Sequence, residues 1–401
     1  MIFMMLRFLR SRNRLHGVFL AFFLMWAAGV QAQAPAAKPV VLADARATAK
    51  AQIMADPRAT ATAQIMAGIQ PAAGDPVIDR LLATESWAYH KAAMDAQWKP
   101  VRARLDAIEK WRDQEVKLSN VSSRTLLYPF SGPDFLNAWA LYPNHGKYVF
   151  FSLESPGTQP KLEKMSEKEF DAMLRDVRHA FNEIFQRNYF ITSFMGKQLT
   201  TPHIKGTVPI VTTMMALYGL RVAKIESLDP FPELTSAYLE PKAKRPGKIL
   251  RGVKITFIDS ANVPHELSYF SLDATDKALA YYPDFLDWVG RNRPASALLK
   301  SASYLLHDNQ FSKTRDMILA SADVLVQDDT GVPFRYIKQA NWNVKLFGKY
   351  HKPIKPMQWG YQSDLDQAFR EPDVKERGTL PFPFGYHWKG VESGLILAAR
   401  P

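Results

Sequence analysis

The sequence contains no cysteine among its 401 residues. Disulfide bonds, thiolate metal sites, cysteine nucleophiles and an anchor on a lipid-modified cysteine are therefore all excluded. A chain without such cross-links must be stabilised by its core. The hydrophobic content of 47% over this length is enough to build a large one.

Long apolar runs are also scarce, and the clearest one, residues 18–28, lies near the N-terminus. Four arginines and no acidic residue precede it, and small residues at a signal-peptidase spacing follow it. The run is shorter than the roughly 20 residues that span a bilayer. Residues 1–34 are therefore predicted to be a secretory signal peptide, cleaved near Ala32 or Ala34, with an uncleaved anchor as the alternative. The mature chain is predicted to be periplasmic or secreted, with no transmembrane span.

Acidic residues are fewer than basic ones, 39 against 51, and the formal net charge is +12. Removing the four arginines of residues 1–34 leaves +8 (12 − 4). This excess favours anionic neighbours such as phosphate-bearing envelope polymers or membrane head groups. The densest basic cluster, residues 242–248, contains Pro and Gly and is typical of a solvated loop, so nucleic acid is not predicted as a partner. An exported protein does not meet the cytoplasmic nucleotide pools, and no nucleotide cofactor is predicted.

Several catalytic motifs are missing. Ser131 has Pro129 and Pro133 where a nucleophile elbow needs glycines, which argues against a Ser-His-Asp hydrolase. Gly132 stands alone where dinucleotide-binding turns need two or three glycines. The histidines lack the paired spacing of a zinc site and are predicted to be hydrogen-bonded loop residues. Six of the nine histidines are considered as such candidates: His145, His203, His265, His307, His351 and His387.

The chain divides by composition. Residues 35–74 are rich in Ala and contain a short repeat, with near copies at 46–54 and 58–66, and this stretch is predicted to be a linker. Asp75-Pro76 is a good helix start, and helical spacing continues to Trp111. Residues 75–120 are therefore predicted to be a helical hairpin appended to a single mixed domain over 121–401.

Strands and helices interleave within residues 121–401. This order predicts an α/β or α+β fold, in which helices flank a mixed twisted sheet. A capping box at Ser166–Glu169 begins a long predicted helix with one apolar face. The predicted strands are 124–130, 148–153, 221–227, 249–259, 265–272, 323–327, 343–350 and 393–398. The predicted helices are 133–141, 166–185, 208–220, 275–291, 295–306 and 312–320.

Polar residues follow three of these strands, 124–130, 148–153 and 323–327. Ligands in an open α/β sheet bind beyond the carboxyl ends of parallel strands. If the three strands are parallel neighbours, their carboxylates and hydroxyls converge on one acidic cleft. Such a cleft could bind a divalent cation such as Ca²⁺ or Mg²⁺, or supply an acid and a base. The predicted ligand-binding residues are Ser131, Asp134, Glu154, Asp328, Asp329 and Arg335.

Each of these residues also has a structural interpretation. Ser131 or Asp134 could cap the helix that follows. Asp328-Asp329-Thr-Gly is ordinary turn composition. Arg335 could clamp an anion or pair with Asp329. The aromatic side chains of the last seventy residues could line a glycan groove, but packing in the core and loops explains them better.

Two motifs, Tyr128-Pro-Phe-Ser-Gly-Pro-Asp134 and Gln327-Asp-Asp-Thr-Gly-Val-Pro-Phe-Arg-Tyr336, resemble those of a family of uncharacterised exported bacterial proteins. The resemblance covers most of residues 120–390. It implies an exported location and a shared fold, and it implies no activity and no catalytic residue.

The sequence thus predicts an exported soluble protein that binds a small molecule or a component of the cell envelope. Cofactor-independent hydrolysis is one reaction that the predicted cleft could carry out. The alternative is a non-enzymatic envelope protein whose helical front end and basic surface contact a partner. The residues fix neither a reaction nor whether the protein is an enzyme.

Overall fold

The structure is a computed structural model of the chain. It describes residues 53–116, 124–187, 196–228, 250–292, 294–301, 303–386 and 393–401. The predicted signal peptide, most of the first copy of the repeat, the basic segment 242–248 and His387 lie outside the described residues.

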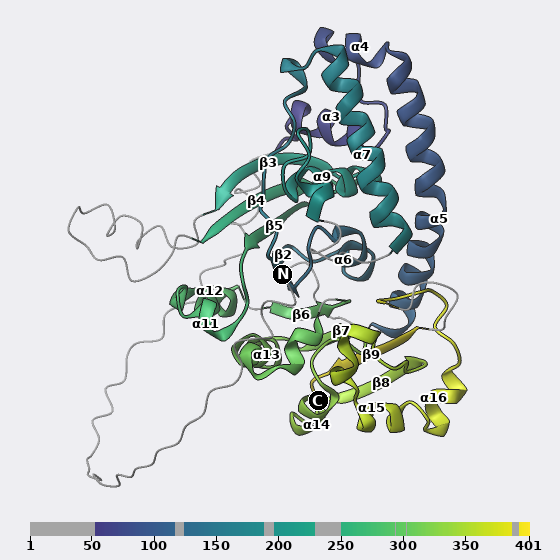
Figure 1. Cartoon of the computed structure of the whole chain (residues 1–401), viewed down its shortest axis with the longest axis vertical. Helices are drawn as coiled ribbons and strands as arrows, with labels where there is room; N and C mark the ends of the chain where they lie inside the picture. The colour runs from purple at the N-terminus through teal and green to yellow at the C-terminus, as the bar shows by residue number, and fades with distance from the viewer. Residues whose placement is uncertain are drawn as a thin grey trace, which may run out of the picture. The chain divides into compact units, whose positions relative to one another are not determined.

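A mixed sheet of nine strands runs through the described residues, in the order β3-β4-β5-β2-β1-β6-β7-β9-β8 (Figure 1). The five central strands, from β5 to β7, are mutually parallel. The outer strands pair antiparallel to their neighbours. The strands are β1 (Thr125–Pro129), β2 (Lys147–Ser152), β3 (Arg221–Leu228), β4 (Arg251–Ile258), β5 (Pro264–Ser271), β6 (Pro294–Leu299), β7 (Val324–Gln327), β8 (Asn343–Gly348) and β9 (Gly394–Ala399).

Helices cover both faces of the sheet. Side chains alternate along a strand, so Leu126 and Tyr128 of β1 belong to one core cluster and Leu127 to the other. The first face is covered by α3 (Pro57–Met66), α4 (Pro76–Leu82), α5 (Glu85–Glu115), α6 (Phe135–Leu141), α7 (Glu167–Arg187) and α9 (Val208–Leu217). The second is covered by α11 (Asp276–Leu279), α12 (Pro283–Arg291), α13 (Ser312–Ser321), α14 (Phe334–Gln339), α15 (Ser363–Ala368) and α16 (Pro372–Arg377). The predicted α/β class is confirmed.

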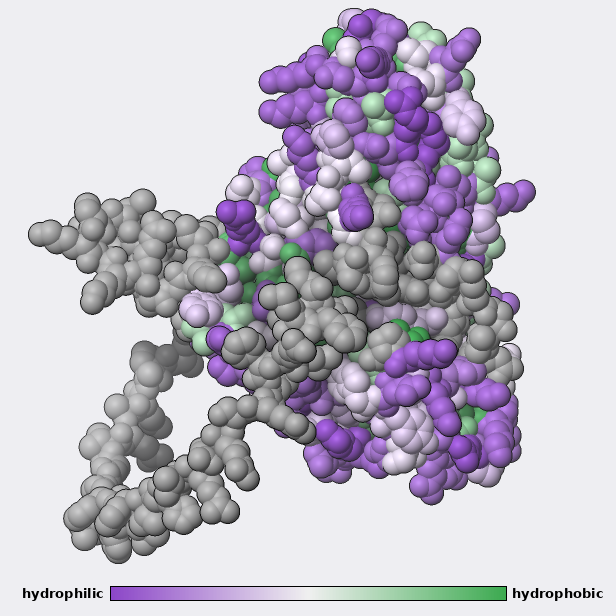
Figure 2. All heavy atoms as spheres, in the orientation of Figure 1, coloured by the Kyte–Doolittle hydropathy of each residue, from purple (hydrophilic) through white to green (hydrophobic). Residues whose placement is uncertain are grey.

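Local signals in the sequence set several element boundaries. Asp75 caps α4 by accepting a hydrogen bond from the Val77 amide at 3.0 Å, as predicted. The predicted capping box is also present, since the amide of Ser166 donates to Glu169 Oε2 and the amide of Glu169 donates to Ser166 Oγ. The apolar face of α7 is buried in the first core cluster. Hydrophilic residues predominate over the region of α4 and α7 in Figure 2, as expected for helices with one buried side.

The predicted helix over 295–306 is wrong in its first half, where the chain forms β6. Its Ala, Ser and Leu residues have no strong strand preference, and alone they favour a helix. Strand β6, however, lies between β1 and β7 and pairs with both in parallel. A parallel strand covered on both faces needs only a continuous buried run, which residues 296–299 provide. The predicted helix 275–291 is two helices, with Pro283 at the start of the second.

Part of the predicted linker belongs to the folded body. Residues 57–66, which include the whole second copy of the repeat, form α3, and its Ile65 and Met66 side chains are fully buried. The Asp56 amide donates a hydrogen bond to the Val222 carbonyl of β3 at 2.8 Å, and the Thr60 hydroxyl donates to the same oxygen at 3.0 Å. Helix α3 is therefore stabilised both by the helix propensity of its Ala-rich sequence and by packing against β3 and α9.

Replacing Asp56 by Ala tests this correction. Asp56 Oδ1 accepts hydrogen bonds from the amides of Arg58 and Ala59, at 2.9 and 3.0 Å, and so caps α3. Loss of this cap is expected to lower the free energy of unfolding by about 1 kcal/mol in urea titrations. Asp95→Ala, at an exposed position within α5, is the control and should change stability much less. Equal effects of the two changes would mean that residues 56–66 do not contribute to the fold.

The predicted helical appendage also differs from the structure. Instead of a hairpin of two helices of similar length, the chain forms the short helix α4 and then α5, which has 31 residues. Helix α5 packs against α6 and α7 and reaches the far strands, where Trp111 contacts Phe347 and Phe382 edge-on with ring centroids 5.2 and 5.8 Å apart. It therefore covers the first face of the sheet, and this position brings Arg104 towards the strand ends.

Candidate functional site

Three neighbouring parallel strands, β1, β6 and β7, end at the same edge of the sheet. The segments that follow them begin at Phe130, Lys300 and Asp328. The bends after β1 and β6 contain non-glycine residues in the left-handed conformation, Phe130 with φ 57° and Ser301 with φ 60°. This conformation costs roughly 1–2 kcal/mol for such a residue. Strain of this kind is concentrated at functional sites.

Asp134, in the bend after β1, is held by four groups. Its Oδ1 accepts hydrogen bonds from the amide and the side chain of Asn137, at 3.3 and 2.8 Å, so it caps α6. Its Oδ2 accepts a hydrogen bond from the Tyr128 hydroxyl at 2.8 Å and lies 2.5 Å from Lys300 Nζ. Burial alone would raise the pKa of Asp134, but the Lys300 ammonium and these hydrogen bonds lower it. Asp134 is therefore an ionised carboxylate at neutral pH.

Lys300 follows β6 and is 3% exposed. Burial lowers the pKa of its amine, and the nearby charge of Arg104 acts in the same direction, while Asp134 and Asp328 oppose the shift. Nζ lies 2.5 Å from Asp134 Oδ2 and has no further hydrogen-bond partner among the described residues. A buried amine of lowered pKa can act as a proton acceptor or a nucleophile.

Asp328 is the first residue after β7, and its charge acts on Lys300. Its Oδ2 accepts a hydrogen bond from the Ser301 amide at 2.9 Å, and its Oδ1 accepts from the amide of Thr330 at 3.0 Å and from its hydroxyl at 2.5 Å. Burial raises the pKa of Asp328 even though these hydrogen bonds and Lys300 oppose the change. The bond to Ser301 joins the ends of β6 and β7 and holds Ser301 in its left-handed conformation.

Replacing Gly385 by Ala should disturb Asp328 directly. A Cβ atom at Gly385 would lie 2.1 Å from Asp328 Oδ2, and its φ is +67°. Gly219 is a matched control, since it has φ +73° and no atom within 4 Å of the added Cβ. Gly219→Ala is expected to cost about 1 kcal/mol from the backbone alone, and Gly385→Ala about 1–3 kcal/mol more because of the overlap. Urea unfolding of both variants measures the difference, and equal losses would contradict the close packing on Asp328.

Asp329 lies beside Asp328 but turns to a different set of partners. Its Oδ2 accepts a hydrogen bond from the Tyr304 hydroxyl at 2.5 Å, and its carbonyl accepts from Gln362 at 2.9 Å. Burial, together with the charge of Asp328, raises the pKa of Asp329 to about 7. Near neutral pH this carboxyl therefore still holds a proton in a large fraction of molecules. Asp134 and Asp329 are thus an ionised and a protonated carboxyl on neighbouring segments.

The other predicted residues are placed differently. Ser131 is 2% exposed, lies in the bend before Asp134, and its hydroxyl has no hydrogen-bond partner among the described residues. The Glu154 carboxylate accepts a hydrogen bond from the Ser152 hydroxyl, and its carbonyl accepts one from Tyr269 at 2.9 Å, so it is bound to the ends of β2 and β5. Arg335 is exposed and stacks on its neighbour Tyr336, with its guanidinium 4.9 Å from the ring centroid. The structure thus brings together Ser131, Asp134, Asp328 and Asp329, and Arg335 has no ion pair with Asp329.

Three residues of this cluster were not predicted. Lys300 was missed because its strand was predicted to be a helix. Tyr128 lies in a correctly predicted strand, but its hydrogen bond to Asp134 depends on the bend between them. Arg104 comes from α5, and its charge acts on Asp134 and Lys300. The positively charged side of the site was therefore absent from the prediction of an acidic cleft.

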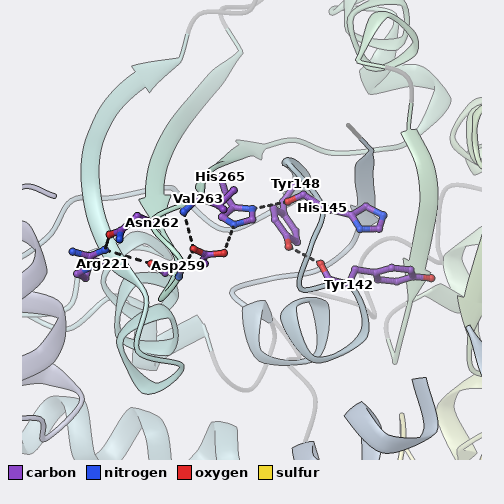
Figure 3. Close-up of polar contacts among 9 residues, drawn as sticks. Tyr142, His145, Tyr148, Arg221, Asp259, Asn262, Val263 and His265 are labelled. Carbon is purple, nitrogen blue, oxygen red and sulfur yellow. Dashed lines mark hydrogen bonds and ion pairs between the residues drawn. The ribbon is translucent and has the colours of Figure 1, made fainter. Parts of the chain in front are cut away.

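A second polar network lies at the opposite ends of the parallel strands (Figure 3). His265 of β5 contacts the His145 carbonyl through Nδ1 at 2.8 Å and Asp259 Oδ2 through Nε2 at 3.3 Å. Asp259 also accepts hydrogen bonds from the amides of Ala261 and Val263, at 2.9 and 2.8 Å, which close the hairpin between β4 and β5. Both ring nitrogens of His265 are therefore occupied, and we assign the network to the hairpin fold. This agrees with the predicted role of His145 and His265 as hydrogen-bonded residues.

A cavity of about 470 Å³ opens near the C-terminal end of α6, the end opposite Asp134. Its charged side chains already have partners: Arg102 pairs with Glu109 at 2.9 Å, and Arg112 donates to the Ala140 carbonyl at 2.5 Å. The residues that line it are Arg102, Glu109, Arg112, Trp139, Pro143, Leu217 and Tyr218. With its cations already paired, this cavity offers a weaker candidate site than the strand ends.

Two further properties bear on function. Within the described ranges, no group of three or more His, Asp or Glu side chains is arranged to hold a metal ion. Among the helices that the structure describes, none is long and apolar enough to cross a membrane.

Comparison of the chain with protein-family models, with curated proteins and with solved structures found no match. The resemblance carried by the two motifs therefore stays a prediction.

Proposed function

We propose that this protein is exported and binds a small molecule, taken from the cell envelope or its surroundings, at the joined ends of β1, β6 and β7. The observation that carries the proposal is the buried contact between Lys300 Nζ and Asp134 Oδ2, at 2.5 Å. It lies at the edge of a parallel sheet where α/β proteins bind their ligands. Left-handed residues on two adjacent strand ends support the same location.

The arrangement of ionisable groups supports a chemical role in addition to binding. Asp134 is an ionised carboxylate, and Lys300 is a buried amine beside it. Asp329 retains a proton close to neutral pH. Groups with separated pKa values can act as base and acid in one reaction, without a nucleotide cofactor. Hydrolysis of an envelope-derived compound is the reaction class that we propose.

A ligand screen tests the proposal. The mature chain would be tested for thermal stabilisation by cell-wall fragments and small organic acids, because a ligand that binds only the folded state raises the melting temperature. Binding should be lost in Asp134→Asn and kept in Asp364→Asn, whose carboxylate forms a half-exposed surface pair with Lys338 at 3.2 Å. A ligand that binds both variants equally would place its site elsewhere. Fractionation of cells that express the full chain tests export separately.

The same variants separate an enzyme from an envelope interaction protein. If the protein only contacts a macromolecular partner through its surface, Asp134→Asn should reduce stability and leave partner capture unchanged. If the strand ends carry out chemistry, turnover of the selected compound should be abolished by Asp134→Asn under conditions in which the variant is still folded.

A further inference from the structure

Four buried groups near the strand ends that can donate hydrogen bonds have donors without partners within the described part of the chain. They are Lys300 Nζ (beyond its contact with Asp134), Ser131 Oγ, Ser301 Oγ and Arg104 Nε. One buried acceptor there, Asn137 Oδ1, also has no partner among the described residues. Lys300, Ser131 and Ser301 are at most 3% exposed. A buried polar group without a partner costs roughly 1–3 kcal/mol, and most proteins contain few of them. Their concentration in one place needs a physical reason.

The four groups belong to neighbouring segments. Ser131 lies in the bend after β1, and Lys300 and Ser301 follow β6, the strand that pairs with β1. Arg104, on α5, interacts electrostatically with both Lys300 and Asp134. The two serines flank a contact between a cation and an anion that is already formed.

All four groups can donate hydrogen bonds, whereas the nearby carboxylates are occupied. Asp134 accepts from Tyr128 and Asn137, and Asp328 accepts from Ser301 and Thr330. Donors without partners therefore outnumber the single such acceptor, Asn137 Oδ1, among the described residues near the bends, and a cation would find no free carboxylate. This argues against the predicted Ca²⁺ or Mg²⁺ site at these residues and in favour of a ligand with negatively charged oxygens.

The charges near the bends indicate how much negative charge the ligand carries. Lys300 and Arg104 contribute two positive charges, and Asp134, whose pKa is lowered, contributes one negative charge. Burial raises the pKa of Asp328, which disfavours a second negative charge. Burial also lowers the pKa of Arg104 to about 10 and lowers that of Lys300, and Asp134 opposes both shifts. When Asp328 holds a proton, one further negative charge balances the cluster.

We infer that the bends after β1 and β6 form a subsite for the carboxylate of a small monoanionic molecule, held by Lys300, Arg104 and the hydroxyls of Ser131 and Ser301. This inference rests on the proposed function and names the class of its ligand. A planar carboxylate presents two oxygens to a guanidinium and its neighbours. The left-handed backbone at Ser301 then fixes the positions of two of the four donors, Lys300 Nζ and Ser301 Oγ.

The test uses the mature chain and the sodium salts of formate, acetate and pyruvate, with sodium chloride and sodium phosphate at matched ionic strength. A carboxylate is expected to raise the melting temperature of the wild type saturably, at concentrations up to roughly 100 mM, beyond the effect of chloride. Ser131→Ala is expected to weaken this carboxylate binding about tenfold. Without ligand, the same variant should be as stable as the wild type or more stable, because it removes an unpaired buried hydroxyl. If Ser131 were needed only for structure, Ser131→Ala would lower the stability of the ligand-free protein and leave carboxylate binding unchanged.

Arg104→Gln should abolish the effect of carboxylates, and Arg102→Gln, two residues away on α5 and paired with Glu109, should leave it unchanged. The inference is overturned if no carboxylate stabilises the wild type, or if stabilisation is the same in Ser131→Ala and Arg104→Gln. Stronger stabilisation by phosphate with the same dependence on Arg104 would also overturn the monoanionic class. An envelope fragment that binds wild type and Arg104→Gln equally would overturn this inference while leaving the proposed function intact.

Discussion

Replacing Lys300 by Met is expected to lower the free energy of unfolding by about 3–5 kcal/mol at neutral pH. The substitution removes the ammonium that lies 2.5 Å from Asp134 and leaves that carboxylate buried without its cation. The aliphatic part of the side chain is retained, so the loss reports the charge and not the packing. Urea unfolding followed by circular dichroism measures the change.

The matched control is Lys338→Met. Lys338 pairs with Asp364 at 3.2 Å, but its side chain is 52% exposed, so water replaces the pair at little cost. Its loss should be within about 0.5 kcal/mol of zero. In the double variant Lys300→Met/Asp134→Asn, part of the lost stability should return because no unpaired charge remains. If Lys300→Met were as mild as Lys338→Met, the buried ion pair would not exist in solution.

Acidification from about pH 7 to about pH 4 is expected to destabilise the protein by several kcal/mol, owing mainly to three buried histidines. Burial, with help from nearby arginines, lowers the pKa of His90 to about 4, of His145 to about 3 and of His307 to about 4. In the unfolded chain each titrates near its ordinary value of 6.5. Between 6.5 and 4 the unfolded state therefore binds more protons, and stability falls as the pH falls. Each histidine contributes at most about 3 kcal/mol.

Two carboxyls act in the opposite direction. The pKa of Asp329 is raised to about 7 and that of Asp328 is also raised, so their contribution to stability is present at low pH and is lost as the pH rises. Three histidines outweigh two carboxyls in this window, and the lowered pKa of Asp134 adds a further loss below about pH 4. Acid therefore destabilises the protein overall.

The free energy of unfolding measured in urea at several pH values tests this prediction. His90→Gln should flatten the curve between 6.5 and 4, since an amide can still donate to the Ile65 and Met66 carbonyls that His90 contacts at 3.1 Å. His179→Gln on α7, at an exposed position, is the control and should leave the curve unchanged. Asp329→Asn should steepen it by removing an opposing group. A stability that stays constant or increases on acidification would show that these histidines are accessible to protons in the folded state.

The sequence was sufficient to locate one side of the candidate site. Short apolar runs over 124–130 and 323–327 end in polar bends, and both proved to be parallel strands of one sheet. Because parallel strands end at one edge, Asp134 and Asp328 are brought to the same side without any long-range information. Asp134 was one of two residues, with Ser131, that local chemistry offered as the cap of α6, and it forms that cap together with its contact to Lys300.

The other side of the site depends on tertiary structure. Residues 295–299 are Ala-Ser-Ala-Leu-Leu, which favours a helix locally, and only pairing with β1 and β7 makes them a strand. Lys300 becomes a strand end through that pairing. Arg104 lies on a helix whose helical spacing was predicted, but no local pattern indicates which turn of it approaches Asp134. Glu154 also follows a predicted strand, but it does not join the site, because Ser152 and Tyr269 bind it at the ends of β2 and β5.

A crystal structure of the mature protein grown in sodium formate tests the central claim most directly. The account predicts a formate ion between Lys300 Nζ and the Arg104 guanidinium, within hydrogen-bond distance of Ser131 Oγ or Ser301 Oγ. It also predicts that the contact between Lys300 and Asp134 is retained. The account is contradicted if the four donors bond to other protein groups and formate binds elsewhere.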